Sequence, residues 1–150
     1  MNIYSQVLEY IKQLGESDIF VNTITQGNQL DLNKANIFPL LNISINTGSF
    51  SNGATIVLNV ELSCLDIRDT NKELVTDKFW LQDNEVDNLN ETLATLNRLW
   101  LIMYRDFSDN NITASENPQL QAIKFEEKNL LDGWTLTFDI EVLNTTISLC

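Results

Sequence analysis

The side chains that carry out most protein chemistry are either missing from this sequence or scattered through it. There is no histidine among its 150 residues. Histidine is the usual general base near neutral pH and the commonest metal ligand, so Ser-His and Cys-His nucleophile pairs are excluded. The sequence also lacks a Gly-x-Ser-x-Gly elbow, a Ser-x-x-Lys motif and a phosphate-cradling glycine loop. We therefore expect a protein that is not an enzyme and that needs no cofactor.

Two short segments rich in carboxylates are the remaining candidates for a metal site. A calcium loop needs alternating Asp or Asn ligands, then a glycine, and a Glu at the twelfth position. Neither segment has the glycine or that final Glu. We therefore expect solvated turns or the start of a helix at these positions, and no metal. The six carboxylates are Asp66, Asp69, Glu73, Asp83, Glu85 and Asp87.

The charge balance excludes a large class of partners. The 21 acidic residues outnumber 9 Lys and Arg, which gives a formal net charge of -12 at pH 7. Affinity for a nucleic-acid backbone comes mainly from Lys and Arg that replace counterions, so we expect no specific DNA or RNA binding. No apolar run approaches the ~20 residues of a membrane span. The two cysteines, Cys64 and Cys150, are too few for a disulfide framework and suit synthesis in a reducing cytoplasm.

Two segments have the spacing of three and four residues that is typical of a helix with one apolar side. The first runs from Ile3 to Leu14, and we expect Gly15 to end it. The second runs from Asn84 to Phe107, roughly 35 Å at 1.5 Å per residue. Its predicted buried stripe consists of Val86, Leu89, Leu93, Leu96, Trp100, Met103 and Phe107.

The second half of the long helix is apolar almost all round, at residues 99–104. Such a helix must be covered on all sides. Either the sheet and another element enclose it, or a second subunit completes the burial, which makes Leu101 and Ile102 interface candidates. Arg98 and Arg105 lie one heptad apart on the side opposite the predicted stripe. They form either a solvated ridge or ion pairs with a neighbouring acidic subunit.

Alternating polar and apolar residues predict a long β-hairpin between the two helices. Its strands are Ile37 to Asn46 and Ala54 to Ile67, joined by a loop from Asn46 to Gly53. That loop carries Phe50, a further interface candidate. Cys64 falls on the apolar side of the second strand, where we expect it to be a small core residue.

Three more strands are indicated later in the chain. One is a less regular segment from Leu74 to Leu81, in which Trp80 is a candidate interface anchor. The last two form a closing pair, Ile123 to Glu126 and Trp134 to Val142. Together the elements predict an α+β fold with a mainly antiparallel sheet that contains the long β-hairpin. One long helix and a short N-terminal helix pack on that sheet, in a single domain over residues 1–150.

The order of these elements resembles the ring-forming neck and tail-terminator proteins of tailed bacteriophages, including the connector ring proteins of crAss-like phages. The resemblance covers nearly the whole chain. It rests on the opening helix (Ile3 to Leu14), the hairpin (Ile37 to Ile67), the long helix (Asn84 to Phe107) and the closing strand, whose sequence is GWTLTFDIEV at residues 133–142.

This resemblance implies a structural virion protein of the neck or tail, made in the host cytoplasm. Its copies would form a ring, six- or twelve-fold, between portal or adaptor proteins and tail proteins. DNA would pass through the central channel without specific binding, and the family has no catalytic residues to carry over. A cyclic ring needs two different complementary patches on each subunit. The apolar end of the long helix and the loop with Phe50 are the candidates.

The negative charge agrees with two different functions. An acidic channel wall repels DNA and lets it slide past. The alternative is a small acidic binding protein of the immunity or inhibitor type, which blocks a basic toxin or enzyme through its charge. The long helix and the extended loops favour the ring protein.

Overall fold

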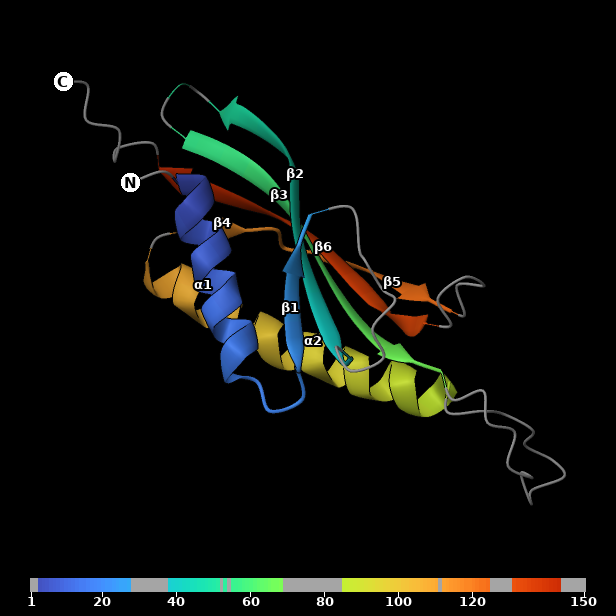
Figure 1. Cartoon of the computed structure of the whole chain (residues 1–150). Coiled ribbons are helices and arrows are strands. Elements are labelled where there is room, and N and C mark those ends of the chain that lie inside the picture. The colour runs from blue at the N-terminus through green and yellow to red at the C-terminus, as the bar shows by residue number, and fades with distance from the viewer. Residues whose placement is uncertain are drawn as a thin grey trace, which may run out of the picture.

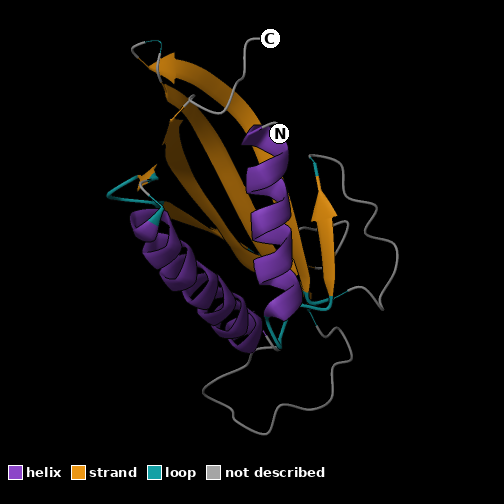
Figure 2. Ribbon diagram, turned by 90° about the vertical axis from the view of Figure 1, so that its left-hand side faces the viewer, coloured by secondary structure: helices purple, strands orange, loops and turns teal. Residues whose placement is uncertain are grey.

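The computed structural model describes residues 3–27, 38–51, 53, 55–68, 85–110, 112–124 and 131–143. In this part of the chain, two helices cover one face of a six-stranded, mostly antiparallel sheet (Figures 1 and 2), which confirms the predicted α+β class. The elements in chain order are α1 (Ile3–Ser17), β1 (Thr23–Gln26), β2 (Leu40–Ser51), β3 (Thr55–Ile67), α2 (Glu85–Asp109), β4 (Thr113–Ala114), β5 (Gln119–Ile123) and β6 (Leu131–Leu143).

The sheet is built around the β2–β3 hairpin and the final strand. Its order is β1-β2-β3-β6, and both β4 and β5 pair with the remaining edge of β6. β1 runs parallel to β2, whereas the other pairings of the described strands are antiparallel. The pairing of β3 with β6 is unbroken from Thr55 opposite Leu143 to Ile67 opposite Leu131. Alternate residues of both strands therefore face the helices along their whole length.

The main core lies between the two helices and one face of the sheet. α1 packs on the side of β1 and β2, and α2 lies across β3 and β6 (Figure 2). Each fully buried aliphatic side chain contributes roughly 1.5–3 kcal/mol to stability. Cys64 is among the buried residues, as predicted, and its thiol is free. The core comprises Ile3, Val7, Ile11, Leu41, Ile43, Val60, Leu62, Cys64, Leu96, Leu99, Met103, Phe107, Leu136, Phe138 and Ile140.

Gly15 does not end the first helix, contrary to the sequence-based expectation. α1 continues to Ser17, and Gly15 is buried within it. A Cβ atom at this position would lie 2.8 Å from Cδ1 of Ile24 and 2.9 Å from Cδ2 of Leu41. The absence of a side chain at Gly15 therefore allows the helix to pack closely on the sheet, and this residue does not terminate the helix.

The buried stripe of α2 differs from the predicted one in its first half. Val86, expected inside, is 45% exposed, whereas the polar residues Asn88 and Thr92 are buried. The Thr92 hydroxyl donates to the Asn88 carbonyl (2.6 Å), and the Asn88 amide donates to the Ile67 carbonyl (2.9 Å). Because these polar groups have partners, they can occupy a core position that apolar periodicity does not assign to them. The observed stripe consists of Asn88, Thr92, Thr95, Leu96, Leu99, Met103 and Phe107.

The hairpin turn is much tighter than the predicted loop from Asn46 to Gly53. β2 continues to Ser51, which pairs with Thr55, and Gly53 lies in the turn with a φ of 69°. The β2–β3 register shifts at residue 46, which has no counterpart on β3. Such a bulge shifts the alternation of polar and apolar residues by one position. The residues after it no longer fit the pattern of the residues before it, so the sequence predicted a loop where the strand continues.

Of the two closing strands that the sequence predicts, the second is confirmed as β6, and the first lies earlier in the chain than predicted. β5 ends at Ile123, where that strand was predicted to begin. The predicted strand from Leu74 to Leu81, with Trp80, lies outside the described residues, and so does Cys150. Neither described helix is long and apolar enough to cross a membrane.

Candidate functional site

The far end of the β2–β3 hairpin is uncharged and only partly covered. We call it the hairpin end, residues 46–51, 53 and 55–58. It rises past the two helices in Figure 1. Residues 35–60 contain no charged side chain, in a sequence in which 20% of residues are charged. Phe50 lies opposite Ile56 on the face of the sheet that carries the helices, and it is 76% exposed.

One edge of the hairpin end is also open. β1 pairs with β2 only from Leu40 to Ile43, and the backbone N–H of Gly27 adds one bond to the Ile43 carbonyl (3.0 Å). Among the described strands, none pairs with the outer edge of residues 46–51. Exposed edges are commonly protected by charged side chains, prolines or bulges. This edge has the bulge at residue 46 but neither a charge nor a proline, so it can accept a partner.

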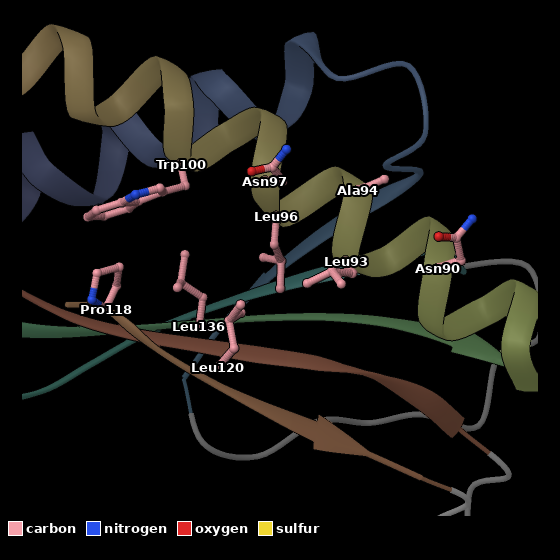
Figure 3. Close-up of a pocket in the computed structure, with 9 residues that line it drawn as sticks. All are labelled: Asn90, Leu93, Ala94, Leu96, Asn97, Trp100, Pro118, Leu120 and Leu136. Atoms are coloured by element: carbon pink, nitrogen blue, oxygen red, sulfur yellow. The ribbon is translucent and has the colours of Figure 1, made fainter.

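A second uncharged surface is a groove of about 380 Å³ between α2 and β5 (Figure 3). We call it the α2 groove. Trp100 on the helix and Pro118 and Leu120 on the sheet side extend toward one another across it, while Leu96 and Leu136 lie deeper. The lining residues, none of them charged, are Asn90, Leu93, Ala94, Leu96, Asn97, Trp100, Pro118, Leu120 and Leu136.

Exposed apolar side chains extend this groove along α2. Leu101 is 61% exposed and Tyr104 is 58% exposed, while Ile102 is half-buried. The Trp100 ring lies 5.0 Å from Phe138 and 6.1 Å from Tyr104, centroid to centroid. The sheet covers one side of the apolar second half of α2, and α1 covers a second side through Tyr10, whose ring lies 5.8 Å from Phe107 and whose hydroxyl donates to Asp106 (2.6 Å). Neither covers Leu101 and Tyr104. This leaves open the alternative in which another subunit completes the burial of α2.

Arg98, predicted to lie on a solvated ridge or to pair with a neighbouring subunit, forms an ion pair within its own chain. Its guanidinium donates two hydrogen bonds of 3.0 Å to the carboxylate of Asp18, just after α1. Burial disfavours the ionised form of Asp18, but the bonds from Arg98 and from the Phe20 backbone outweigh it and hold the pKa of Asp18 below its usual value. Arg105 is exposed, with Asp106 at 3.7 Å, and stays an interface candidate.

The other end of the sheet is closed by a buried ion network, which we call the proximal network. Arg68 bonds Asp132 twice, through Nε at 2.9 Å and Nη2 at 2.7 Å, and Nη2 also lies 3.0 Å from Glu85. The Asp132 side chain is fully buried. Beside it, the Trp134 indole donates to the Leu89 carbonyl (2.9 Å). These contacts join the start of α2 to the ends of β3 and β6.

The carboxylates of the two predicted clusters lie in different environments in the structure. Glu85 belongs to the proximal network and begins α2, as expected for the start of a helix. Burial, with a smaller contribution from Glu91, raises the pKa of Asp66 above its usual value, although the Ile67 N–H partly offsets this. In the described part of the chain no three carboxylates or thiols are grouped closely enough to hold a metal ion. Asp87 also lies in the first turn of α2, and Asp69, Glu73 and Asp83 lie outside the described residues.

The face of the sheet away from the helices is polar and acidic from its middle toward the hairpin end, whereas Leu40, Leu65 and Leu131 form a second, buried apolar cluster on its proximal part. Glu61, Asp139 and Glu141 belong to the acidic part, and the register places Glu61 opposite Thr137. Asp139 accepts a bond from the Asn59 amide (2.9 Å). The six described strands contain no Lys or Arg. We call this surface the open face.

Sequence reasoning identified Phe50 and Leu101 as surface candidates but missed the α2 groove. The groove depends on how β5 lies against α2, which no local pattern encodes. The long uncharged run over residues 35–60 could have indicated the hairpin end. No protein-family model matches this chain, and no curated protein matches it.

Proposed function

We propose that this chain is a structural virion protein whose copies form a ring around the DNA channel in the neck or tail of a tailed bacteriophage. Portal or adaptor proteins would lie on one side of the ring and tail proteins on the other. The resemblance in the order of the elements supports this function. The observation that carries it is the pair of unlike uncharged surfaces on one subunit, the hairpin end and the α2 groove. The hairpin end and strand β5, which borders the groove, pair with opposite ends of β6 (Figure 1).

Cyclic assembly requires such a pair. Each copy in a ring contacts two neighbours through two different patches, whereas a two-fold dimer uses the same patch twice. The charge distribution limits which surfaces of the subunit can form the contact between copies. Copies that each carry a net charge of -12 repel one another, so close packing is favoured where carboxylates are absent or paired with Lys or Arg. The hairpin end and the α2 groove both meet this condition.

We propose the open face as the wall of the channel. Glu61, Asp139 and Glu141 present negative charge there, and the described strands offer no Lys or Arg to bind phosphates. A wall of this kind keeps DNA from binding and lets it pass. The other polar side chains that the register places on this face are uncharged, among them Gln119 and Gln121 of β5 and the pair Ser63 and Thr135, which hydrogen-bond to each other at 2.9 Å.

Electron microscopy of virions labelled with gold-conjugated antibodies against this chain tests the proposed location. We expect gold particles at the head–tail junction or along the tail. Absence of the chain from purified particles would contradict the proposal. Its recovery instead in a one-to-one complex with a basic protein would support the immunity- or inhibitor-type alternative.

A further inference from the structure

We infer that Phe50 of one copy inserts into the α2 groove of the next copy. This inference rests on the proposed ring and names the contact that would hold it together. Phe50 stands at the hairpin end with its ring 76% exposed, between two serines whose side chains are short. Aromatic side chains are enriched in the buried centres of protein–protein interfaces.

The α2 groove has the size and the chemistry to receive this ring. An apolar cavity of about 150 Å³ is enough to bind benzene, and the groove offers about 380 Å³. Trp100 forms one wall, and its ring already makes tilted contacts with Phe138 and Tyr104. A phenylalanine ring beside Trp100 would extend this aromatic cluster in the tilted geometry that such pairs prefer.

The charges favour a second copy over other occupants. The groove has no carboxylate in its lining, so it offers nothing to attract a basic partner. The hairpin end has no charge of its own, and the nearby Glu141, which accepts a bond from the Thr55 hydroxyl (3.0 Å), lies on the face of the sheet opposite to Phe50. The face with Phe50 can therefore approach an acidic copy with little repulsion. Two other exposed apolar residues do not lie in uncharged surroundings. Ile19 follows Asp18, and Val86 lies between two carboxylates. Phe50 is therefore the exposed apolar residue best suited to self-association.

The pairing is head-to-tail, because each copy gives a hairpin end on one side and offers a groove on the other. Repeated around an axis, such a contact closes a ring. The same geometry predicts how defective copies should behave. A copy with a damaged hairpin end can still receive a neighbour, and a copy with a damaged groove can still donate its Phe50.

Photo-cross-linking tests the contact while preserving the aromatic side chain. A benzophenone analogue of phenylalanine replaces Phe50, and the variant is mixed with isotope-labelled wild-type chain before illumination. We expect cross-links from position 50 to labelled peptides that carry Trp100 or Leu120, which proves contact between copies. The same analogue at the fully exposed Ile19 is the matched control and should not reach these peptides.

Native mass spectrometry of two charged variants gives an independent test. Phe50→Asp and Leu120→Asp change exposed positions, and circular dichroism checks that both stay folded. We expect neither variant to form rings alone, while their mixture gives one-to-one dimers and nothing larger, and Ile19→Asp assembles normally. If the wild-type chain forms rings but position 50 cross-links elsewhere and the mixture stays monomeric, the pairing is wrong and the ring stands. A wild-type chain that never assembles would overturn both.

Discussion

The β2–β3 hairpin is enclosed at one end and open at the other. At the proximal end, β3 pairs on both sides, lies under α2 and meets the network of Arg68, Glu85 and Asp132. At the hairpin end, the same strands carry no charge, no other described strand pairs with the outer edge of β2, and Phe50 is exposed. The first arrangement stabilises the subunit by itself. The second leaves Phe50 uncovered, and we propose that a contact with another copy covers it.

Glycine positions at the two ends should differ most in their tolerance of a side chain. A Cβ at Gly133 would collide with the backbone carbonyl of Cys64 across the β3–β6 ladder. Backbone atoms cannot turn away, so we expect Gly133→Ala to lower the free energy of unfolding by about 5 kcal/mol or more. At Gly48 in the hairpin end, the nearest atom is a Leu58 methyl at 3.2 Å. Gly48→Ala should lower the free energy of unfolding by less than about 1 kcal/mol. Urea denaturation measures both variants, and equal losses at Gly133 and Gly48 would contradict the difference between the two ends.

The proximal network should show the next largest effect. Asp132→Ala leaves the Arg68 guanidinium buried without the carboxylate that binds it twice. Removing one partner of a buried ion pair typically costs about 3–5 kcal/mol. Asp139→Ala on the open face removes an exposed bond to Asn59 and should cost under about 1 kcal/mol. Urea titrations of both variants at pH 7 measure the difference, and a loss at Asp132 no greater than that at Asp139 would refute the stabilising role.

Phe50 should affect association and leave the subunit stable. Phe50→Ala removes an exposed ring, so the free energy of unfolding of the monomer should change by less than about 0.5 kcal/mol. Burial of such a side chain in a neighbour is worth about 1.5–3 kcal/mol. Association should therefore weaken by about 10- to 100-fold per contact. Analytical ultracentrifugation measures this loss, and unchanged association with reduced monomer stability would reverse our assignment of the two ends.

Asp66 gives the smallest effect and shows that the proximal end is not uniformly stabilising. Burial raises its pKa, so the folded state binds the proton more tightly than the unfolded state does. Its favourable contribution is present at low pH and is lost as pH rises through the raised pKa. The ionised carboxylate therefore costs stability at pH 7. We expect Asp66→Asn, which keeps an oxygen for the Ile67 N–H (2.8 Å), to raise the denaturation midpoint at pH 7.

The advantage of Asp66→Asn should shrink as the pH approaches 4, because the wild-type carboxyl group then becomes neutral as well. Denaturation midpoints measured across this range provide the check. A variant that is less stable than the wild type at pH 7 would show that the Asp66 carboxylate is stabilised in a way that its burial does not indicate.

The sequence predicted those parts of the fold in which one repeating pattern covers a whole element. The alternation in β6 and the helical spacing of α2 are examples, because each element packs one side against the same core. Departures from a pattern were not predictable. The bulge at residue 46 shifts one strand, and hydrogen-bonded Asn88 and Thr92 take core positions that apolar counting assigns elsewhere.

Contacts between distant segments were the least accessible to sequence reasoning. Arg98 pairs with Asp18, 80 positions away, so its role within the chain could not be inferred from the helix alone. The α2 groove likewise exists only because β5 and α2 meet at a distance that no local motif sets. Phe50 was identified for its surface position, but its place on a strand with an open edge depends on the tight turn at Gly53.

Native mass spectrometry of the purified chain, alone and mixed with the products of the genes beside its own, tests the central claim most directly. We expect a closed assembly of six or twelve copies and no series of larger open oligomers. In a closed ring, every hairpin end occupies the α2 groove of a neighbour, so no surface is left for further copies. A chain that stays strictly monomeric under all of these conditions would contradict it.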